Sequence, residues 1–303
     1  MTDINIEKIL IDQQIRKIEL IEEGWSFDKL YLIHLDNGLK QICRVAPIEK
    51  KDYKKREFEL IEKAYAKGIA THKPLEFKVD EINRVCYLLV DYIPGKQAEF
   101  VLSDFSKEKQ YDLGVSMGKD LKKIHEIEVN SIIDWQTTYT KRIQERIEEY
   151  YKSGYRSDKI EQMIEYINDN LYLLEDRPIC HNHGDFHAGN IIINPKGKAF
   201  VIDYNRHRVA DAYHDFNRIY FSYRVSPYFA KGQIEGYFNN QVPKHFFKYM
   251  KFYILSVVIG SISWAMMFEQ SDVDFAKRSI EEIYYGYDEL KLDIPKWYKK
   301  IDY

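Results

Sequence analysis

The sequence predicts an α+β protein with two lobes, a small N-terminal β-sheet lobe that carries one helix and a larger, mainly helical C-terminal lobe. Two apolar runs, residues 29–35 and 39–45, are joined by Asp-Asn-Gly at 36–38, a turn sequence typical of β-hairpins. From residue 105 onwards, by contrast, apolar residues recur mainly at helical spacing. The 303 residues are enough to give each lobe its own core.

The boundary between the lobes is expected where an apolar strand ends. Residues 87–90 form a strongly apolar run, and Pro94-Gly95 follows shortly after it. A Pro-Gly pair cannot continue a central strand, so the sheet should stop before it. We therefore predict an N-terminal lobe at residues 1–92 and a C-terminal lobe at 93–303.

Other elements of the N-terminal lobe follow from local patterns. Residues 4–14 have apolar side chains at helical spacing, and residues 18–21 are a candidate strand. A helix is predicted at 54–66, because its apolar residues share one face and Gly68 follows as a C-terminal stop.

Helices dominate the second lobe. Leu113, Met117, Leu121 and Ile124 form one apolar stripe that ends at His125, as expected for a helix facing a core. Further helices are predicted at residues 142–151, 158–174, 243–268 and 272–288. The apolar stretch from 252 to 268 is interrupted by serines and a glycine and is short for a membrane span, so a buried helix is favoured.

Composition restricts the possible partners and the compartment. The chain is 45 % hydrophobic and 31 % charged, with a net charge of −3, which predicts no attraction to nucleic acid or to anionic membranes. Three scattered cysteines in no metal-binding spacing suggest a reducing compartment. No signal peptide is recognisable at the N-terminus. We expect a cytoplasmic protein that is a monomer or a weak dimer.

The residues with the clearest chemical potential precede a second hairpin. The polar stretch His-Asn-His-Gly-Asp-Phe-His-Ala-Gly-Asn occupies 181–190, and two short apolar runs around an Asn-Pro-Lys-Gly turn occupy 191–202. Asn190 enters the first strand and Asp203 leaves the second, so both side chains are expected at one open end. Asp185 lies on the loop just before. Two oxygen ligands beside a loop carboxylate suit a Mg²⁺-nucleotide with a nearby base.

This pattern resembles that of the aminoglycoside phosphotransferase family, small-molecule kinases with a protein-kinase-like fold to which choline kinase is more distantly related. The family pattern, His-Gly-Asp, four residues, Asn, then Ile-Asp, is matched at 183–190 and 202–203. The resemblance implies that ATP or GTP binds between the lobes and that Asn190 and Asp203 hold Mg²⁺. It also implies that Asp185 orients the acceptor hydroxyl and accepts its proton.

Arg44 is the expected phosphate-binding residue. It lies in an apolar strand, where a cation is costly unless it is paired. The resemblance implies contacts with the nucleotide phosphates and with a helix carboxylate, for which Glu57 is the first candidate and Glu59 and Glu62 are rivals. An edge-strand arginine that reaches solvent is the alternative.

The remaining nucleotide contacts are implied by the resemblance alone. The loop Gly24-Trp25-Ser26 corresponds to the family's phosphate-side loop, which makes Ser26 a candidate nucleotide contact. The end of the strand at 87–90 corresponds to the hinge, where backbone groups of Asp91 and Ile93 would hydrogen-bond a purine. A plain strand-to-loop transition explains the same residues.

Downstream of the hairpin the sequence departs from the family. Ala210 and Ala212 stand where Gly and Pro are usual, whereas Asp211 and Asp215 match. We expect these two aspartates to bind the catalytic loop and to cap a helix rather than to touch the substrate.

The acceptor is the least determined feature. The family phosphorylates aminoglycosides, macrolides, choline-like alcohols and sugars, and Gly184, where choline kinases commonly carry Asn, favours the aminoglycoside type. Polycationic acceptors need carboxylates, and the candidates by position are Glu235, Glu269, Asp272 and Asp274, each of which could equally belong to a solvated turn. The alternatives are a kinase of another small alcohol and a non-catalytic nucleotide-binding module. A protein kinase is not expected, because no Asp-Phe-Gly and no Ala-Pro-Glu segment follows.

Overall fold

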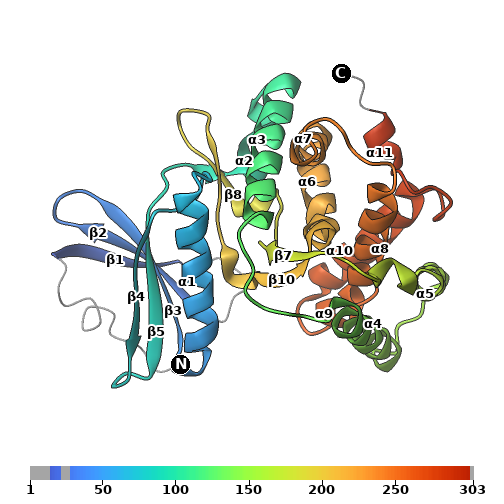
Figure 1. Ribbon diagram of the computed structural model, residues 1–303, viewed down its shortest axis with the longest axis horizontal. Coiled ribbons are helices and arrows are strands. Elements are labelled where there is room, and N and C mark those ends of the chain that lie inside the picture. The colour runs from blue at the N-terminus through green and yellow to red at the C-terminus, as the bar shows by residue number, and fades with distance from the viewer. Residues whose placement is uncertain (1–13, 22–27, 301–303) are drawn as a thin grey trace. The chain divides into compact units, whose positions relative to one another are not determined.

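The computed structural model describes residues 14–21 and 28–300 (Figure 1). The predicted helix at 4–14 falls almost entirely outside the described residues, and so does Ser26. The chain divides into two compact units, each made of two stretches of sequence. We call them the sheet unit and the helical unit, and they comprise Met1–Gln97 with Ile191–Arg206, and Ala98–Asn190 with His207–Tyr303.

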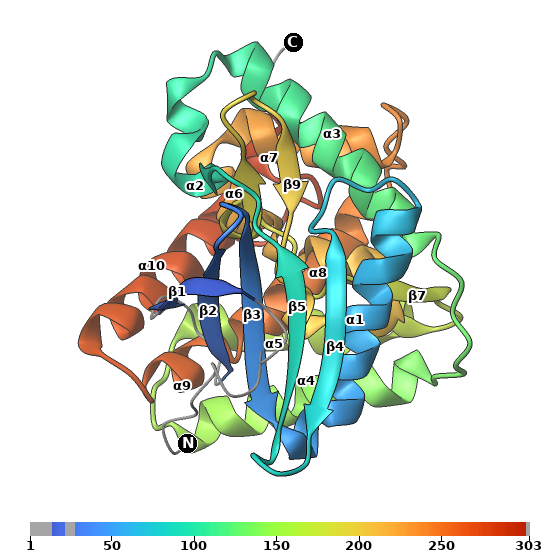
Figure 2. The ribbon, with the colours of Figure 1, turned by 90° about the vertical axis from the view of Figure 1, so that its left-hand side faces the viewer.

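The sheet unit is built on a five-stranded antiparallel sheet with the order β1-β2-β3-β5-β4 (Figure 2). The predicted hairpin is formed by β2 and β3, and the predicted apolar strand is β5. Strand β4 was not predicted; it is an edge strand whose side chains are half-buried or exposed. The strands are β1 (Ile15–Ile21), β2 (Lys29–Leu35), β3 (Lys40–Pro47), β4 (Pro74–Asp80) and β5 (Val85–Asp91).

The two faces of this sheet bury different sets of residues, because side chains alternate along a strand. On one face Cys43 and Val45 of β3 belong to a cluster with Tyr87 and Leu89 of β5. On the other face Leu88 and Val90 pack against Phe58 of helix α1 (Lys51–Ala66), with Ile42 beside them. Arg44 lies between Cys43 and Val45, so the alternation directs its side chain to the face covered by α1.

The second predicted hairpin is part of the sheet unit. Strands β8 (Ile191–Ile193) and β9 (Ala199–Val201) pair antiparallel, and β6 (Lys96–Gln97) extends this small sheet by pairing with β8. Val201 is tied to the segment after α1, because its N–H donates to Ala70 O at 2.9 Å and its carbonyl accepts from Thr71 Oγ1 at 2.8 Å.

The division between the units therefore differs from the predicted lobes, 1–92 and 93–303. Because β6 still pairs with β8, the chain leaves the sheet unit only after Gln97. The hairpin then returns residues 191–206 to the sheet unit, although they lie far along the chain. This return depends on a pairing between distant segments, which local sequence patterns do not reveal.

The helical unit contains most of the predicted helices, with altered ends. Helix α4 begins seven residues before the predicted start at 142, because Asp134 caps its N-terminus by accepting from Thr137 N. The segment predicted as one helix at 243–268 is divided into two. The elements are α2 (Ala98–Val101), α3 (Lys107–His125), α4 (Trp135–Lys152), α5 (Asp158–Asp169), β7 (Ile179–Asn182), β10 (Arg208–Asp211), α6 (Ile219–Val225), α7 (Pro227–Tyr237), α8 (Phe246–Val258), α9 (Ser261–Ala265), α10 (Gln270–Gly286) and α11 (Lys296–Lys299).

Helices α3 and α7 approach each other closely through glycines. A Cβ added to Gly118 of α3 would lie 2.1 Å from the carbonyl oxygen of Gln233, and one added to Gly232 of α7 would lie 2.2 Å from that of Tyr111. No side chain can occupy such a space, so the backbones themselves are in contact. This contact fixes α3, whose last residue, His125, has its Nε2 2.9 Å from Asp215 Oδ2.

The apolar stretch near the C-terminus is a core element. Among the described residues one stretch, Phe246–Ala265, is long and apolar enough to cross a membrane, but 67 % of its most apolar window is buried within the protein. It consists of α8 and α9, and the fully buried residues of α8 include Phe246, Phe252 and Tyr253. The predicted buried helix is thus confirmed, with a break near Gly260.

Candidate active site

The loop that carries Asp185 is fixed by a buried carboxylate of the helical unit. Asp215 accepts hydrogen bonds from the backbone N–H groups of His183 at 2.8 Å and Gly184 at 2.7 Å, and His125 Nε2 lies 2.9 Å from Asp215 Oδ2. Burial alone would raise the pKa of Asp215, but the bond and charge of His125 and the backbone N–H of Gly184 hold it below the ordinary value. An ionised Asp215 thus clamps the loop, as the sequence predicted.

The residues on either side of Asp185 shape the loop around it. Gly184 has φ +85°, a left-handed conformation that glycine adopts without strain. The Asp185 N–H donates to His183 Nδ1 at 3.3 Å, and the His183 ring is fully buried against Phe186. His183 therefore supports the loop backbone, which agrees with the structural role expected for it.

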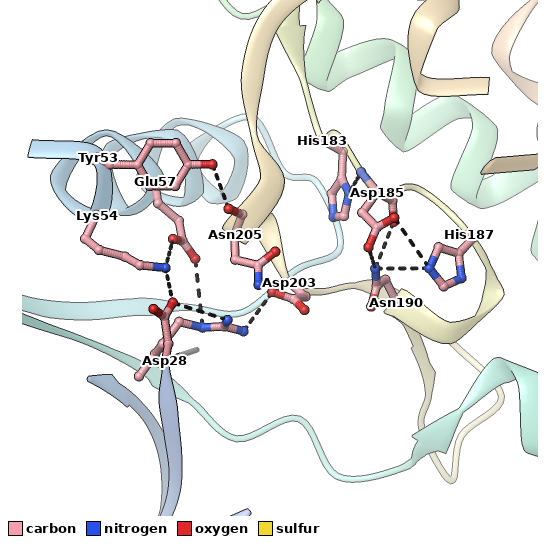
Figure 3. A network of polar contacts seen from close by, with 11 residues as sticks. Asp28, Tyr53, Lys54, Glu57, His183, Asp185, His187, Asn190, Asp203 and Asn205 are labelled. Atoms are coloured by element: carbon pink, nitrogen blue, oxygen red, sulfur yellow. Dashed lines mark hydrogen bonds and ion pairs between the residues drawn. The ribbon is translucent and has the colours of Figure 1, made fainter. Parts of the chain in front are cut away.

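Asn190 is bonded to the same loop through its amide nitrogen (Figure 3). Its Nδ2 donates to the backbone oxygen of Asp185 at 2.8 Å and to Asp185 Oδ2 at 3.2 Å. Among the described residues no donor is bonded to Asn190 Oδ1. The amide is thus oriented by its nitrogen, which leaves its oxygen as a candidate ligand for a hard cation.

Two further residues of the helical unit lie beside Asp185. Arg218 Nε is 3.3 Å and His187 Nε2 is 3.8 Å from Asp185 Oδ1. Phe221 packs against the His187 ring at 5.4 Å between centroids and lies under the Arg218 guanidinium. Sequence reasoning missed Arg218, which is 33 positions from Asp185 and directly precedes helix α6.

In the sheet unit, Arg44 is surrounded by three carboxylates. Its NH2 group lies 2.7 Å from Asp203 Oδ1, its NH1 group 3.8 Å from Asp28 Oδ2, and its Nε 4.0 Å from Glu57 Oε1. The predicted pair with Glu57 is therefore at the outer limit of an ion pair, and Asp203 is the closer partner. The alternative of an arginine that reaches solvent is excluded, because the Arg44 side chain is 11 % exposed.

Lys54 is the partner of Glu57 that the sequence analysis missed. Lys54 Nζ lies 2.7 Å from Glu57 Oε2 and 2.5 Å from Asp28 Oδ2 (Figure 3). Helix α1 buries one stripe, and Lys54 and Glu57 stand at its start, ahead of Phe58 and Ile61. The stripe also decides among the candidate carboxylates.

The two rivals of Glu57 point away from this cluster. The Glu59 side chain is 46 % exposed and lies 3.9 Å from Lys55, and Glu62 is exposed. Glu57, by contrast, is 1 % exposed. Among the three candidates only Glu57 can act as the buried carboxylate.

Burial and charge act in opposite directions on the groups of this cluster. Burial would lower the pKa of Arg44, but the carboxylates of Asp203, Glu57 and Asp28 together raise it above the ordinary arginine value. Burial raises the pKa of Glu57, an effect that Lys54 and Arg44 only partly oppose. For Asp28 burial acts in the same upward direction, but Lys54 and Arg44 outweigh it and the pKa is lowered. Arg44 thus remains charged, which the predicted contact with phosphates requires.

Asp203 follows β9 in an unusual backbone conformation. Its φ is +66°, in the left-handed region, which Asp adopts more readily than most residues but still at some cost. The next residues are held by α1, because the Tyr53 hydroxyl donates to the carbonyl oxygen of Asn205 at 2.6 Å. The turn directs the Asp203 carboxylate to Arg44.

The predicted hinge residues follow β5. The Asp91 carbonyl lies 2.7 Å from His72 Nδ1, and its N–H donates to Lys73 O at 3.0 Å. The carbonyl oxygen still has a second lone pair, whereas the N–H is used. In the described part of the chain no acceptor is bonded to the Ile93 N–H, so this group and the Asp91 carbonyl are the two that a base could contact.

Asp211 has the structural role that was expected of it. It accepts from Tyr213 N at 2.9 Å as an N-cap, and it forms an ion pair with Arg177 at 2.6 Å. The Tyr253 hydroxyl donates to it at 2.7 Å. The replacement of Gly and Pro by Ala210 and Ala212 leaves this role intact.

The carboxylates proposed for a polycationic acceptor all have partners within the fold. Glu235 accepts from the hydroxyls of Tyr111 at 2.6 Å and Tyr298 at 3.0 Å. Glu269 and Asp272 form a capping box at the start of α10, and Asp274 accepts from Gln270 at 3.0 Å. These bonds assign structural work to each carboxylate.

The family profile described as "Phosphotransferase enzyme family" matches residues 17–246. A search among curated proteins gave no match.

Similar solved structures include a streptomycin–ATP complex of APH(2")-IIa, with 19 % identity, a TM-score of 0.66, and 94 % of this chain and 99 % of that one covered. Amicoumacin kinase hAmiN in complex with AMP-PNP, Ca²⁺ and Ami has 13 % identity, a TM-score of 0.67, and coverage of 98 % and 97 %. Aminoglycoside phosphotransferase APH(4)-Ia with ADP and hygromycin B has 15 % identity, a TM-score of 0.65, and coverage of 92 % and 98 %. At these identities the likeness concerns the fold, and it confirms the predicted kinase-like fold class.

Proposed function

Because the chain belongs to the phosphotransferase enzyme family, we propose that it moves the γ-phosphate of ATP or GTP to a hydroxyl of a small molecule, with an aminoglycoside-type antibiotic as the first candidate acceptor. The membership makes the protein a phosphotransferase with an alcohol group as acceptor. The nucleotide preference, the site residues and the acceptor are the proposed parts. The observation that carries the proposal is the Asp185 loop, which a buried ionised carboxylate holds in place.

Asp185 is the proposed general base. Its carboxylate would orient the acceptor hydroxyl and accept its proton as the phosphoryl group is transferred. Its backbone is held through His183, and its side chain is contacted by Asn190 and Arg218. Phosphoryl transfer asks the protein mainly for positioning, so a base with a fixed backbone suits the reaction.

Asn190 and Asp203 are the proposed ligands of Mg²⁺. They offer one amide oxygen and one carboxylate, and Mg²⁺ typically takes one or two protein oxygens and completes its shell with water and phosphate. Two protein ligands are therefore enough for this metal. Within the described residues no group of three or more His, Cys, Asp or Glu side chains could hold a metal. When bound, Mg²⁺ neutralises phosphate charge.

Arg44 is the proposed contact of the nucleotide phosphates. It remains charged, and its planar fork suits a bidentate contact with phosphate. The Ile93 N–H and the Asp91 carbonyl are proposed to contact the base, and Ser26 is proposed on the phosphate-side loop. The neighbouring structures with ADP, AMP-PNP or ATP support a nucleotide donor.

The acceptor class is proposed from the ligands of similar structures. Similar solved structures are complexes with gentamicin, streptomycin and hygromycin B, which supports testing aminoglycosides first. The four candidate carboxylates, Glu235, Glu269, Asp272 and Asp274, each already have a partner within the fold, which weakens the case for a polycation bound by them. Macrolides, choline-like alcohols and sugars therefore belong in the same test.

We also propose a cytoplasmic location.

The test is an acceptor panel with purified full-length protein, ATP or GTP, and Mg²⁺. Consumption of nucleotide and phosphorylation of the acceptor are both measured, the second by mass spectrometry. We expect one acceptor class to stimulate nucleotide consumption, and Asp185→Asn to abolish the stimulation. Stimulation by aminoglycosides would establish the first candidate, and stimulation only by another class would replace it.

A further inference from the structure

Lys54 is a buried cation that is not among the residues proposed to act as base or to contact the metal or the nucleotide. Its side chain is 3 % exposed, and its ammonium group lies between Asp28 Oδ2 at 2.5 Å and Glu57 Oε2 at 2.7 Å. A buried lysine is costly to desolvate unless it is fully paired, and these two carboxylates pair it. Lys54 therefore neutralises the two carboxylates at the inner end of the cluster.

Arg44 contacts the same two carboxylates, but only weakly. Its guanidinium lies 3.8 Å from Asp28 and 4.0 Å from Glu57, compared with 2.7 Å from Asp203. The strong contact of Arg44 is thus on the side of the hairpin, and the strong contacts of Asp28 and Glu57 are with Lys54. Asp203 is thus the close partner of Arg44, and Asp28 and Glu57 are the close partners of Lys54.

The charges of the cluster explain why this division matters. Three carboxylates, those of Asp28, Glu57 and Asp203, face two buried cations. If Lys54 carried no charge, Arg44 would be the remaining buried partner for all three. Coulomb attraction between unit charges at 4 Å is strong in a protein interior, so Asp28 and Glu57 would draw the guanidinium inward.

We propose that Lys54 is a positioning residue for Arg44, because by occupying Asp28 and Glu57 it leaves the guanidinium directed at Asp203. This inference rests on the proposed function, which places the nucleotide phosphates and the metal at Arg44 and Asp203. Lys54 acts through Arg44 and not on the phosphates, since its ammonium is enclosed by two carboxylates. In this chain the carboxylate of α1 is thus primarily the partner of a lysine from its own helix.

The test measures the dissociation constant of Mg·ATP by calorimetry for wild type and three variants. We expect Lys54→Met to weaken binding about tenfold, because a charge-assisted contact between Arg44 and phosphate is partly lost. Lys50→Met is the matched control. Lys50 also contacts Asp28, at 3.3 Å, but its side chain is 43 % exposed, so we expect less than a twofold change.

The third variant separates positioning from general stability. Lys54→Met combined with Asp28→Asn removes one buried carboxylate together with the buried cation, so less charge competes for Arg44. We expect this double variant to recover most of the lost affinity for Mg·ATP. If Lys54→Met had lost affinity only because it unfolds, a second substitution in the buried cluster would not restore binding. It also keeps the test decisive if Lys54→Met alone folds poorly, because its buried charges are more nearly balanced.

The outcomes are distinguishable. Binding by wild type, loss in Lys54→Met and recovery in the double variant support the positioning role. Binding by wild type with no loss in Lys54→Met, or with no recovery in the folded double variant, overturns it and leaves the proposed function standing. A wild type that binds no Mg·ATP overturns the proposed function and the positioning role together.

Discussion

The two carboxylates proposed to act in the reaction are held in contrasting ways. Asp185, in the helical unit, lies on a loop whose backbone N–H groups are fixed by Asp215 and whose shape depends on Gly184. Asp203, in the sheet unit, is held by its charge, through the ion pair with Arg44. The first arrangement fixes the position of a backbone, and the second fixes the direction of a charge.

The difference matches what each carboxylate has to do. A general base must stay in one place relative to the acceptor, and hydrogen bonds between a buried carboxylate and backbone donors provide that. Asp203 and Arg44 must instead be able to exchange partners, since one is proposed to contact the metal and the other the phosphates. In a cluster of three carboxylates and two cations, Arg44 can exchange Asp203 for a phosphate while the other carboxylates still face a cation.

The largest effect is expected from the base itself. Asp185→Asn should lower kcat by roughly 10²–10⁴, the range for removal of a general base. The dissociation constant of Mg·ATP should change by less than about twofold, because Asp185 is not a proposed nucleotide contact. Steady-state kinetics with the acceptor identified by the panel, together with calorimetry, measure the two effects. Turnover close to wild type would remove Asp185 from this role.

The next effect concerns the charge cluster. Asp203→Ala should weaken the Mg²⁺-dependent binding of ATP by roughly 10²-fold, since a metal ligand is lost and Arg44 loses its nearest partner. Binding is compared with Mg²⁺ and with EDTA, and circular dichroism monitors folding. If Mg²⁺ makes no difference to ATP binding by wild type, the pair Asn190 and Asp203 is not a metal site.

The hydrogen bonds between Asp215 and the Asp185 loop should contribute to the free energy of unfolding. In Asp215→Asn one amide hydrogen replaces an acceptor, so a buried backbone N–H of His183 or Gly184 loses its partner, at a cost of about 1–3 kcal/mol in the free energy of unfolding. Urea unfolding of both proteins at neutral pH measures this difference. A variant as stable as wild type would show that the two backbone bonds to Asp215 do not hold the loop.

The same pair of proteins gives a pH test. The pKa of Asp215 is lowered in the folded state, so its stabilisation is complete above the unfolded pKa of about 4 and is lost as the pH falls through the folded pKa. The difference between wild type and Asp215→Asn should therefore be constant between about pH 5 and pH 7 and should shrink below about pH 4. A difference that grows on acidification would contradict the lowered pKa.

The same comparison shows which features the sequence could predict. The loop from His183 to Asn190 and the hairpin after it are continuous in sequence, so their residue types and spacing predict both the site and the elements that carry it. Asp215 could also be predicted, because the resemblance to a family supplied the role of a distant residue. These predictions depend on local pattern or on a known pattern of motifs.

The features that were missed depend on packing between distant segments. Glu57 was the first candidate, with Glu59 and Glu62 as rivals, and the buried stripe of α1 decides in its favour. Lys54 is one of four lysines on a charged helix, and its partner Asp28 lies far away in sequence, just before β2. The edge strand β4 has a mixed polar pattern, and the hairpin returns to the sheet unit by pairing with β6 and by the bonds of Val201 to Ala70 and Thr71.

The smallest effect is expected from Arg218, the cation beside the base. Its Nε lies 3.3 Å from Asp185 Oδ1, and this ion pair attracts the carboxylate toward the guanidinium. Arg218→Leu should lower kcat about tenfold with a smaller change in the KM for nucleotide, because the group acts on the base and not on the phosphates. Arg224→Leu is the matched control. That arginine is also in this region but pairs with Glu282, so its loss should change kcat by less than about twofold.

A double variant decides whether Arg218 acts through Asp185. In the Asp185→Asn background the carboxylate that Arg218 contacts is absent, so Arg218→Leu should cause little further loss of kcat. Turnover measured for the two single variants and the double variant gives the coupling between them. The full tenfold loss in both backgrounds would mean that Arg218 contacts the substrate independently of the base. In that case the charge beside Asp185 would select the acceptor, and a neutral or anionic acceptor would replace the polycation as the favoured class.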